Sequence, residues 1–163
     1  MKIPIVDEND NIIGVKDREE RNFNDIIRVA VIWITDKNGN ILLQQRKFSK
    51  KVNPGKWGPG VAGTVEEGET YESNAYKELE EEIGVKNVSL TKSKKFFGET
   101  NVGRRFAQLF LCEISKDQEL VPQEDEVQEL KWFSKEEFMN FYKEKPEEFP
   151  SLIKDLIDFF GYK

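Results

Sequence analysis

Residues 63–85 read GTVEEGETYESNAYKELEEEIGV, and this stretch decides the fold of the chain. It predicts a glycine-bearing loop followed by a helix over about residues 69–83, which Gly84 is suited to end in a left-handed cap. Residues 66–82 contain eight glutamates and a single base, Lys77, so the segment carries a formal charge of −7. Because the whole chain carries −6, essentially all of its net acidity lies in this one segment.

Three of these glutamates share one side of the expected helix. On a helical wheel, Glu81 and Glu82 fall within about 60° of Glu78, beside the sector that holds the apolar residues. Like charges three or four residues apart on a helix are destabilising by roughly 0.2–0.5 kcal/mol per pair, so something should offset them. A bound divalent cation is the sharpest candidate, since hard cations prefer clustered carboxylate oxygens. An ordinary solvated acidic face is the competing interpretation.

Composition restricts the classes of protein that need to be considered. With 163 residues and 37% hydrophobic content, the chain is expected to form one domain with a substantial core. Its apolar runs are too short to span a bilayer and its N-terminus turns acidic early, so we expect no membrane segment and no secretory signal. The single cysteine, Cys112, excludes an intramolecular disulfide and favours a cytoplasmic setting. A sequence pI near 5.0 argues against bulk nucleic-acid binding, with a local basic patch as the open alternative.

The chain contains no histidine. This excludes histidine-ligated zinc sites, Ser-His-Asp triads and imidazole general bases. Any acid–base chemistry must therefore use carboxylates, lysines or tyrosines.

The rest of the chain predicts a mixed sheet with few helices. Strands are expected at 3–6 and 11–14, 26–35 and 41–47, 94–98 and 104–114, and 126–133, with a loop-rich passage at 48–63. A capping box at Ser134 opens a short helix, and residues 150–160 form a final amphipathic one. The predicted fold class is α+β, a single domain over 1–163 with an N-terminal extension (1–25), a core (26–140) and a C-terminal helix (150–160).

The acidic stretch also carries a family signature. The spacing Gly63-x5-Glu69-x7-Lys77-Glu78-Leu79-x-Glu81-Glu82-x-Gly84-Val85 resembles the Nudix box of Nudix hydrolases, and only Lys77, where the family has arginine, departs from the pattern. Flanking motifs extend the resemblance over roughly residues 26–140: Leu42–Arg46, Pro54–Trp57, Glu126–Val127 and Trp132–Ser134. The resemblance implies a Nudix-type mixed sheet sandwiched between helices (α/β/α).

The resemblance further implies hydrolysis of a diphosphate linked to another group, commonly a nucleoside, with Mg²⁺ or Mn²⁺ as cofactor. Carried over by position, the metal ligands are Glu78, Glu81, Glu82 and the carbonyl of Ala62. Glu78 is the first choice as the base that deprotonates water, and Glu126 is the alternative base and a further ligand. Glu78, Glu81, Glu82 and Glu126 therefore form the expected catalytic set.

Several cations and aromatic residues are candidates for holding the substrate. Arg46 is expected to bind phosphate oxygens in pairs, with a rim arginine on an edge strand as the competing interpretation. Lys77 is a second expected substrate-binding cation. Arg104 and Arg105 are further candidates, of which strand alternation puts only one on the site face. Three aromatic residues could stack on a base, although such residues more often belong to a core: Trp57, Phe97 and Phe106.

The N-terminal half resembles isopentenyl-diphosphate isomerases and the hydrolases close to them. Isomerase chemistry needs a cysteine directly before the box glycine and histidine metal ligands, whereas this chain has Ala62 there and no histidine. We therefore expect a hydrolase of that branch and no isomerase activity. Nucleoside phosphates, nucleotide sugars and prenyl diphosphates all stay open as substrates, as do a monomer and a homodimer. Lys77 motivates the alternative of a nucleotide-binding or regulatory module with little catalysis.

Overall fold

The computed structural model describes all residues, 1–163, and contains nine strands and three α-helices. In chain order they are β1 (Lys2–Val6), β2 (Ile12–Asp17), β3 (Ile26–Thr35), β4 (Ile41–Arg46), β5 (Trp57–Pro59), β6 (Val61–Thr64), α1 (Tyr71–Ile83), β7 (Thr91–Thr100), β8 (Gly103–Glu113), β9 (Val127–Phe133), α2 (Lys135–Glu144) and α3 (Leu152–Phe160). Two short 3₁₀ turns lie at Arg18–Glu20 and Pro146–Glu148. None of the three helices has the length and apolar character needed to cross a bilayer.

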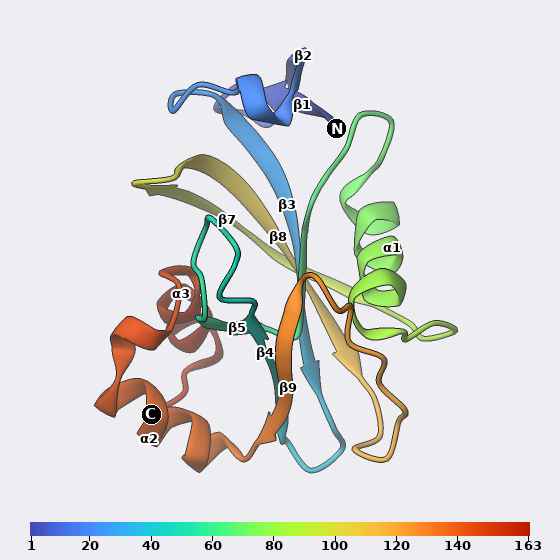
Figure 1. The fold of residues 1–163 in the computed structure, drawn as a ribbon, viewed down its shortest axis with the longest axis vertical. Coiled ribbons are helices and arrows are strands. Elements are labelled where there is room, and N and C mark those ends of the chain that lie inside the picture. Colours follow the sequence, from blue (N-terminus) through green and yellow to red (C-terminus); the bar gives the residue numbers. More distant parts are fainter.

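The long strand β3 lies at the centre of a mixed sheet. It runs parallel to β8, from Ile26 opposite Arg104 to Thr35 opposite Glu113, and antiparallel to β1, β4 and β6. β4 also pairs with β5 and β9. In Figure 1, α1 lies on one side of this sheet, and α2 and α3 lie on the other. The expected α+β fold, a mixed sheet between helices in one domain, is confirmed.

Alternation along β3 divides the core into two clusters. Val31 and Trp33 belong to the cluster that includes α2 and α3, whereas Ile32 and Ile34 pack with α1. β8 alternates in the same way, with Leu109 in the first cluster and its neighbour Phe110 in the second. The central strands of the sheet are therefore buried on both faces, as their apolar sequences require.

The ends of α1 follow from local sequence. Thr70 and Ser73 form a reciprocal capping box at its start, with Ser73 N–H donating to Thr70 Oγ1 over 3.0 Å. Gly84 ends the helix in the left-handed conformation at φ 71°, as predicted. The prediction of loop for residues 48–63 was incomplete, because β5 and β6 both fall at its end. These strands are only three and four residues long and rich in glycine, so the sequence pattern alone gave them no signal.

The N-terminal extension joins the sheet and touches the loop before α1. β1 and β2 form an antiparallel hairpin, and Val6 pairs with Ile26 of β3. The N–H of Glu67 donates to the carbonyl of Lys2 over 2.9 Å. The extension is therefore held against the segment that carries the family signature.

Asp10, at the tip of this hairpin, holds three elements together. Its carboxylate accepts hydrogen bonds from Arg28 Nε at 2.8 Å, Lys95 Nζ at 2.5 Å and the Tyr71 hydroxyl at 2.9 Å. Burial alone would raise the pKa of Asp10, but the bonds from Lys95 and Arg28 hold it below its ordinary value of 3.8. The Asp10 carboxylate thus connects the hairpin to β3, β7 and the first residue of α1.

Asp10→Asn is expected to destabilise the protein by about 2–3 kcal/mol, because it leaves Arg28 partly buried without its counter-charge. Asparagine tolerates the left-handed backbone of this position, φ 63°, so the change isolates the charge. Since a lowered pKa gives stability that is lost as pH falls through it, the difference between the two proteins should shrink below pH 3.8. Urea unfolding across pH measures both effects, with the exposed neighbour Glu8→Gln as the control that should change little.

Candidate active site

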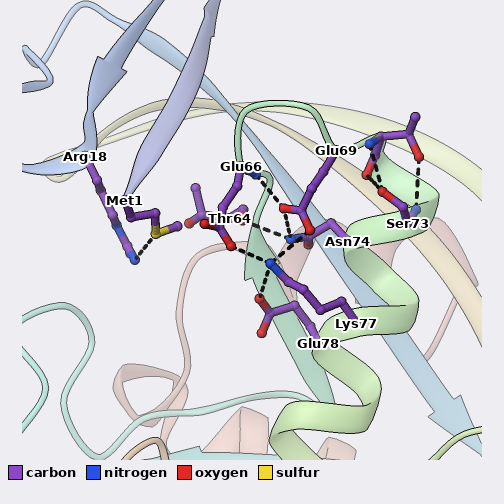
Figure 2. A network of polar contacts seen from close by, with 10 residues as sticks. Met1, Arg18, Thr64, Glu66, Glu69, Ser73, Asn74, Lys77 and Glu78 are labelled. Atoms are coloured by element: carbon purple, nitrogen blue, oxygen red, sulfur yellow. Dashed lines mark hydrogen bonds and ion pairs between the residues drawn. The ribbon is translucent and has the colours of Figure 1, made fainter.

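Lys77 lies at the centre of three carboxylates (Figure 2). Its ammonium contacts Glu66, lies 2.9 Å from Glu69 Oε2 and 3.9 Å from Glu78 Oε1. Partial burial would lower the pKa of Lys77, but the hydrogen bonds to Glu66 and Glu69 outweigh this effect and raise it. Lysine thus supplies here the charge that the family's arginine would supply, and it connects the loop to the helix.

Glu69 fixes the loop before the helix. Its Oε1 accepts from the Glu66 N–H at 2.7 Å and from Asn74 Nδ2 at 3.1 Å. Asn74 is fully buried and also donates to the carbonyl of Thr64 over 3.0 Å. The loop therefore has a defined shape that depends on Glu69, Asn74 and Lys77 together.

Gly63 lets the Glu78 side chain lie against β6. A Cβ atom added at Gly63 would stand 2.3 Å from Glu78 Cγ and 2.6 Å from its Cδ, which is too close for any real contact. Gly63 has no positive φ. The glycine of the signature is therefore needed for space, so that Glu78 can approach the backbone beside Ala62.

Gly63→Ala is expected to displace Glu78 and lower kcat/KM about a hundredfold, since a misplacement of the order of 1 Å costs about that much. The fold should survive, because the clash falls on a side chain. Gly14→Ala in β2, where an added Cβ meets nothing within 4 Å, is the matched control. Equal activity of the two variants would refute this role of Gly63.

Glu82 is a buried carboxyl group that faces the sheet. It is 6% exposed, and its Oε1 accepts from Gln44 Nε2 over 3.0 Å. Gln44, on β4, also donates to the carbonyl of Gly60 over 2.8 Å. Burial and then the hydrogen bond with Glu78 raise the pKa of Glu82 well above its usual range, and burial likewise raises the pKa of Glu78.

The three predicted metal ligands of α1 differ in their surroundings. Glu78 and Glu82 lie together, whereas Glu81 is exposed. Nowhere in the chain do three acidic or cysteine side chains gather in a group that could hold a metal ion. The helix thus offers a close pair of carboxyls and a third at the solvent side, in place of a closed set of three.

Glu126 and Arg46 lie near this pair. Burial lowers the pKa of Arg46, and the nearby charges of Glu126 and Glu82 offset part of this effect. Arg46 Nε donates to the carbonyl of Val52 over 2.8 Å, and Lys50 Nζ contacts Glu126 Oε1 at 2.7 Å. Arg46, Glu126 and Glu82 are therefore brought into one region from β4, the segment before β9, and α1.

The two arginines of β8 point to opposite faces. Arg104 contacts Glu99 at 3.7 Å and Glu8 at 3.8 Å. Arg105 shares the face of Ala107 and Leu109, which is the face covered by α3. Among the aromatic candidates, Trp57 is a core residue that packs on Phe133 with 5.5 Å between ring centroids.

Sequence reasoning missed four residues that shape this region: Gln44, Lys50, Glu66 and Asn74. Gln44 and Asn74 are buried polar residues, and their burial becomes evident only when the strands are paired and the helix is packed on the sheet. Glu66 belongs to the cluster of glutamates in the sequence, but its contact with Lys77 depends on the conformation of the loop. Lys50 had no local signal.

A family model of the NUDIX domain matches residues 25–155 of the chain. An uncharacterized Nudix hydrolase of Yersinia pestis is 33% identical over 136 residues, which cover 83% of this chain and 74% of the relative. The uncharacterized Nudix hydrolase YfcD of Escherichia coli K12 is 32% identical over the same length and shares of the two chains.

Solved structures share the fold at lower identity. A protein of Deinococcus radiodurans, DR0079, has a TM-score of 0.74 at 21% identity and covers 86% of this chain and 87% of its own. The MutT protein of Methanosarcina mazei has a TM-score of 0.71 at 21% identity, over 86% of this chain and 96% of its own. With the signature on α1 and these matches over most of its length, the chain belongs to the Nudix hydrolases, enzymes that cleave pyrophosphate bonds.

Proposed function

We propose that this protein is a Mg²⁺-dependent hydrolase of a diphosphate linkage in a nucleoside diphosphate derivative or a related organic pyrophosphate. The observation that carries the proposal is the close pair formed by Glu78 and Glu82, two carboxyls withdrawn from water beside Arg46 and Glu126. Structural acids are rarely placed in such contact, because two like charges in a buried site repel each other. Perturbed carboxyls of this kind mark functional sites.

The donor set fits a hard divalent cation. Glu78 and Glu82 offer carboxylate oxygens, Glu81 is one turn away on the solvent side, and Ala62 precedes the glycine over which Glu78 lies. Oxygen ligands with no nitrogen or sulfur among them are those that Mg²⁺ prefers. When bound, the metal would neutralise phosphate charge and lower the pKa of an attacking water.

The side chains of this chain take separate roles in the proposed reaction. Glu78 accepts the proton of the attacking water, because a carboxyl with a raised pKa suits that task near neutral pH. Glu126 is the alternative base. Arg46 donates hydrogen bonds to phosphate oxygens. Lys77, occupied by three carboxylates, positions Glu78.

Lys77 weakens the alternative of a binding module with little catalysis. That alternative depended on the loss of the family's arginine, yet Lys77 reaches both Glu69 and Glu78. The carboxylates that an arginine would orient are thus still engaged by a cation. Hydrolysis therefore remains the better proposal.

A hydrolysis screen tests the proposal. Purified protein is incubated with nucleoside di- and triphosphates, nucleotide sugars and prenyl diphosphates, with Mg²⁺, with Mn²⁺ and with excess chelator, and the products are identified by mass. We expect at least one substrate to be cleaved within its diphosphate, with activity lost in chelator and restored by Mg²⁺. Turnover that is unchanged in chelator would overturn the metal dependence, and binding without any turnover would support the regulatory alternative.

A further inference from the structure

Four of the six arginines have no carboxylate partner, although the chain carries 31 acidic residues against 25 basic ones. Arg28 is bound by Asp10, and Arg104 by Glu8 and Glu99. The remaining four make no ion pair within 4.0 Å, and we call them the arginine track: Arg18, Arg21, Arg46 and Arg105.

The members of the arginine track are neighbours in space. Burial is the largest cause that lowers the pKa values of Arg21, Arg46 and Arg105. The nearby charge of Arg18 lowers those of Arg21 and Arg46 further, and the charge of Arg21 does the same for Arg105. They form a series from the carboxyl pair at one end, where Arg46 lies, to the α3 side of β8 at the other. Like charges in partly buried positions repel each other, so this arrangement costs stability in the free protein.

Backbone contacts hold the cations in place. The Arg18 N–H donates to the carbonyl of Met1 over 2.9 Å, and its guanidinium Nη1 lies 3.9 Å from the Met1 sulfur (Figure 2). Arg21 Nη2 donates to the Arg104 carbonyl over 3.5 Å, across Gly103, where an added Cβ would stand 1.9 Å from that nitrogen. The position of Arg21 thus depends on the absence of a side chain at Gly103. Arg105 is the next residue of β8 after Arg104, whose carbonyl Arg21 binds.

Nearby acids do not neutralise the track. The charge of Asp25 raises the pKa of Arg21 to a small extent, but the Asp25 carboxylate is already bound by Lys16 Nζ at 2.7 Å and by the Asn22 N–H at 2.7 Å. Asp155 of α3 acts on Arg105 from beyond ion-pair distance. The Arg21–Arg105 end therefore keeps a positive charge that no carboxylate neutralises by an ion pair.

We propose that the Arg21–Arg105 end of the arginine track binds a second phosphate group of the substrate, separate from the diphosphate that is cleaved. This inference rests on the proposed function, since it places the reacting diphosphate at Arg46 beside the carboxyl pair. Guanidinium groups bind phosphate through paired hydrogen bonds, and adjacent arginines without acids suit a dianion. The substrate class is then an organic diphosphate with an additional phosphomonoester on its non-reacting part.

Two matched pairs of probes test the proposal: coenzyme A against dephospho-coenzyme A, and NADPH against NADH. Each pair differs by one phosphomonoester remote from the diphosphate. Affinities are measured by calorimetry in excess chelator at fixed ionic strength, so that neither turnover nor unequal screening intervenes. We expect the phosphorylated member of at least one pair to bind about tenfold more tightly, the gain of one good ion pair.

Arg105→Gln and Arg21→Gln should each abolish that preference, whereas Arg104→Gln should keep it. The control removes the same charge from the adjacent residue, whose side chain points to the opposite face and is paired with acids. If Arg105→Gln fails to fold, Arg21→Gln carries the test. Equal affinity within both pairs for the unaltered protein, or a preference that persists in both variants, overturns the inference.

The results can support or refute the proposed hydrolysis independently of the second phosphate site. A phosphate preference without any hydrolysis would leave the arginine site standing and remove the enzyme proposal. Hydrolysis of several diphosphates with no preference inside either pair would leave the enzyme proposal standing and remove the arginine site.

Discussion

Glu82→Gln is expected to lower kcat/KM by about a thousandfold while making the folded protein more stable. The loss follows from removing a carboxylate that would hold the divalent cation of the proposed reaction, since an electrostatic contact to the transition state is typically worth about that much. The gain follows from burial, because Glu82 is 6% exposed and adjoins Glu78. Glutamine keeps an oxygen that accepts from Gln44 and cannot ionise, so about 1 kcal/mol and a rise of about 2–4 °C in Tm are expected.

Steady-state kinetics and calorimetry on the same preparation measure these opposite effects. Glu80→Gln, an exposed neighbour on the same helix, is the control and should change neither quantity much. A Glu82→Gln protein that is both less active and less stable would indicate a damaged fold and leave the role of the carboxylate without support. A stable protein with normal turnover would exclude Glu82 from the reaction.

The unequal environments of the three glutamates were partly readable from sequence. The apolar residues Ala75, Leu79 and Ile83 centre on one direction of the wheel, from which Glu82 departs by about 60°, Glu78 by about 100° and Glu81 by about 160°. Their burial follows the same order, from Glu82 through Glu78 to Glu81. The prediction that the three glutamates share one side of the helix does not express this order, which the angles from the apolar sector contain.

Other features of the region could not be predicted locally. Most of the strands, the capping box at Ser134 and the Gly84 cap leave a local signal in the sequence and were predicted correctly, whereas β5, β6 and the capping box at Thr70 were not. The arginine track instead depends on the pairing of β1 with β3 and on the parallel register of β3 with β8, which bring residues 18–21 beside Arg46 and Arg105. No periodicity in a single sequence specifies such a long-range arrangement.

Lys77→Met is expected to destabilise the protein by about 2 kcal/mol and to lower kcat about a hundredfold. The change leaves Glu66, Glu69 and Glu78 around a site with no cation, a partly buried excess of negative charge that is costly even after allowance for solvent screening. Repulsion should turn Glu78 away from its place over Gly63, and a shift of about 1 Å accounts for the loss of rate. Lys86→Met, which removes an exposed lysine near Glu80, is the control.

Lys77→Arg separates a positioning role from direct substrate binding. An arginine can bind Glu69 through paired hydrogen bonds, so we expect activity within about threefold of the unaltered protein. If Lys77 positions Glu78, the methionine variant loses kcat with KM little changed, because the group that acts in the transition state has moved. If Lys77 binds the substrate instead, KM rises and kcat is kept. The contacts of its ammonium with three carboxylates favour the first pattern, since a cation so occupied has little left to offer a phosphate.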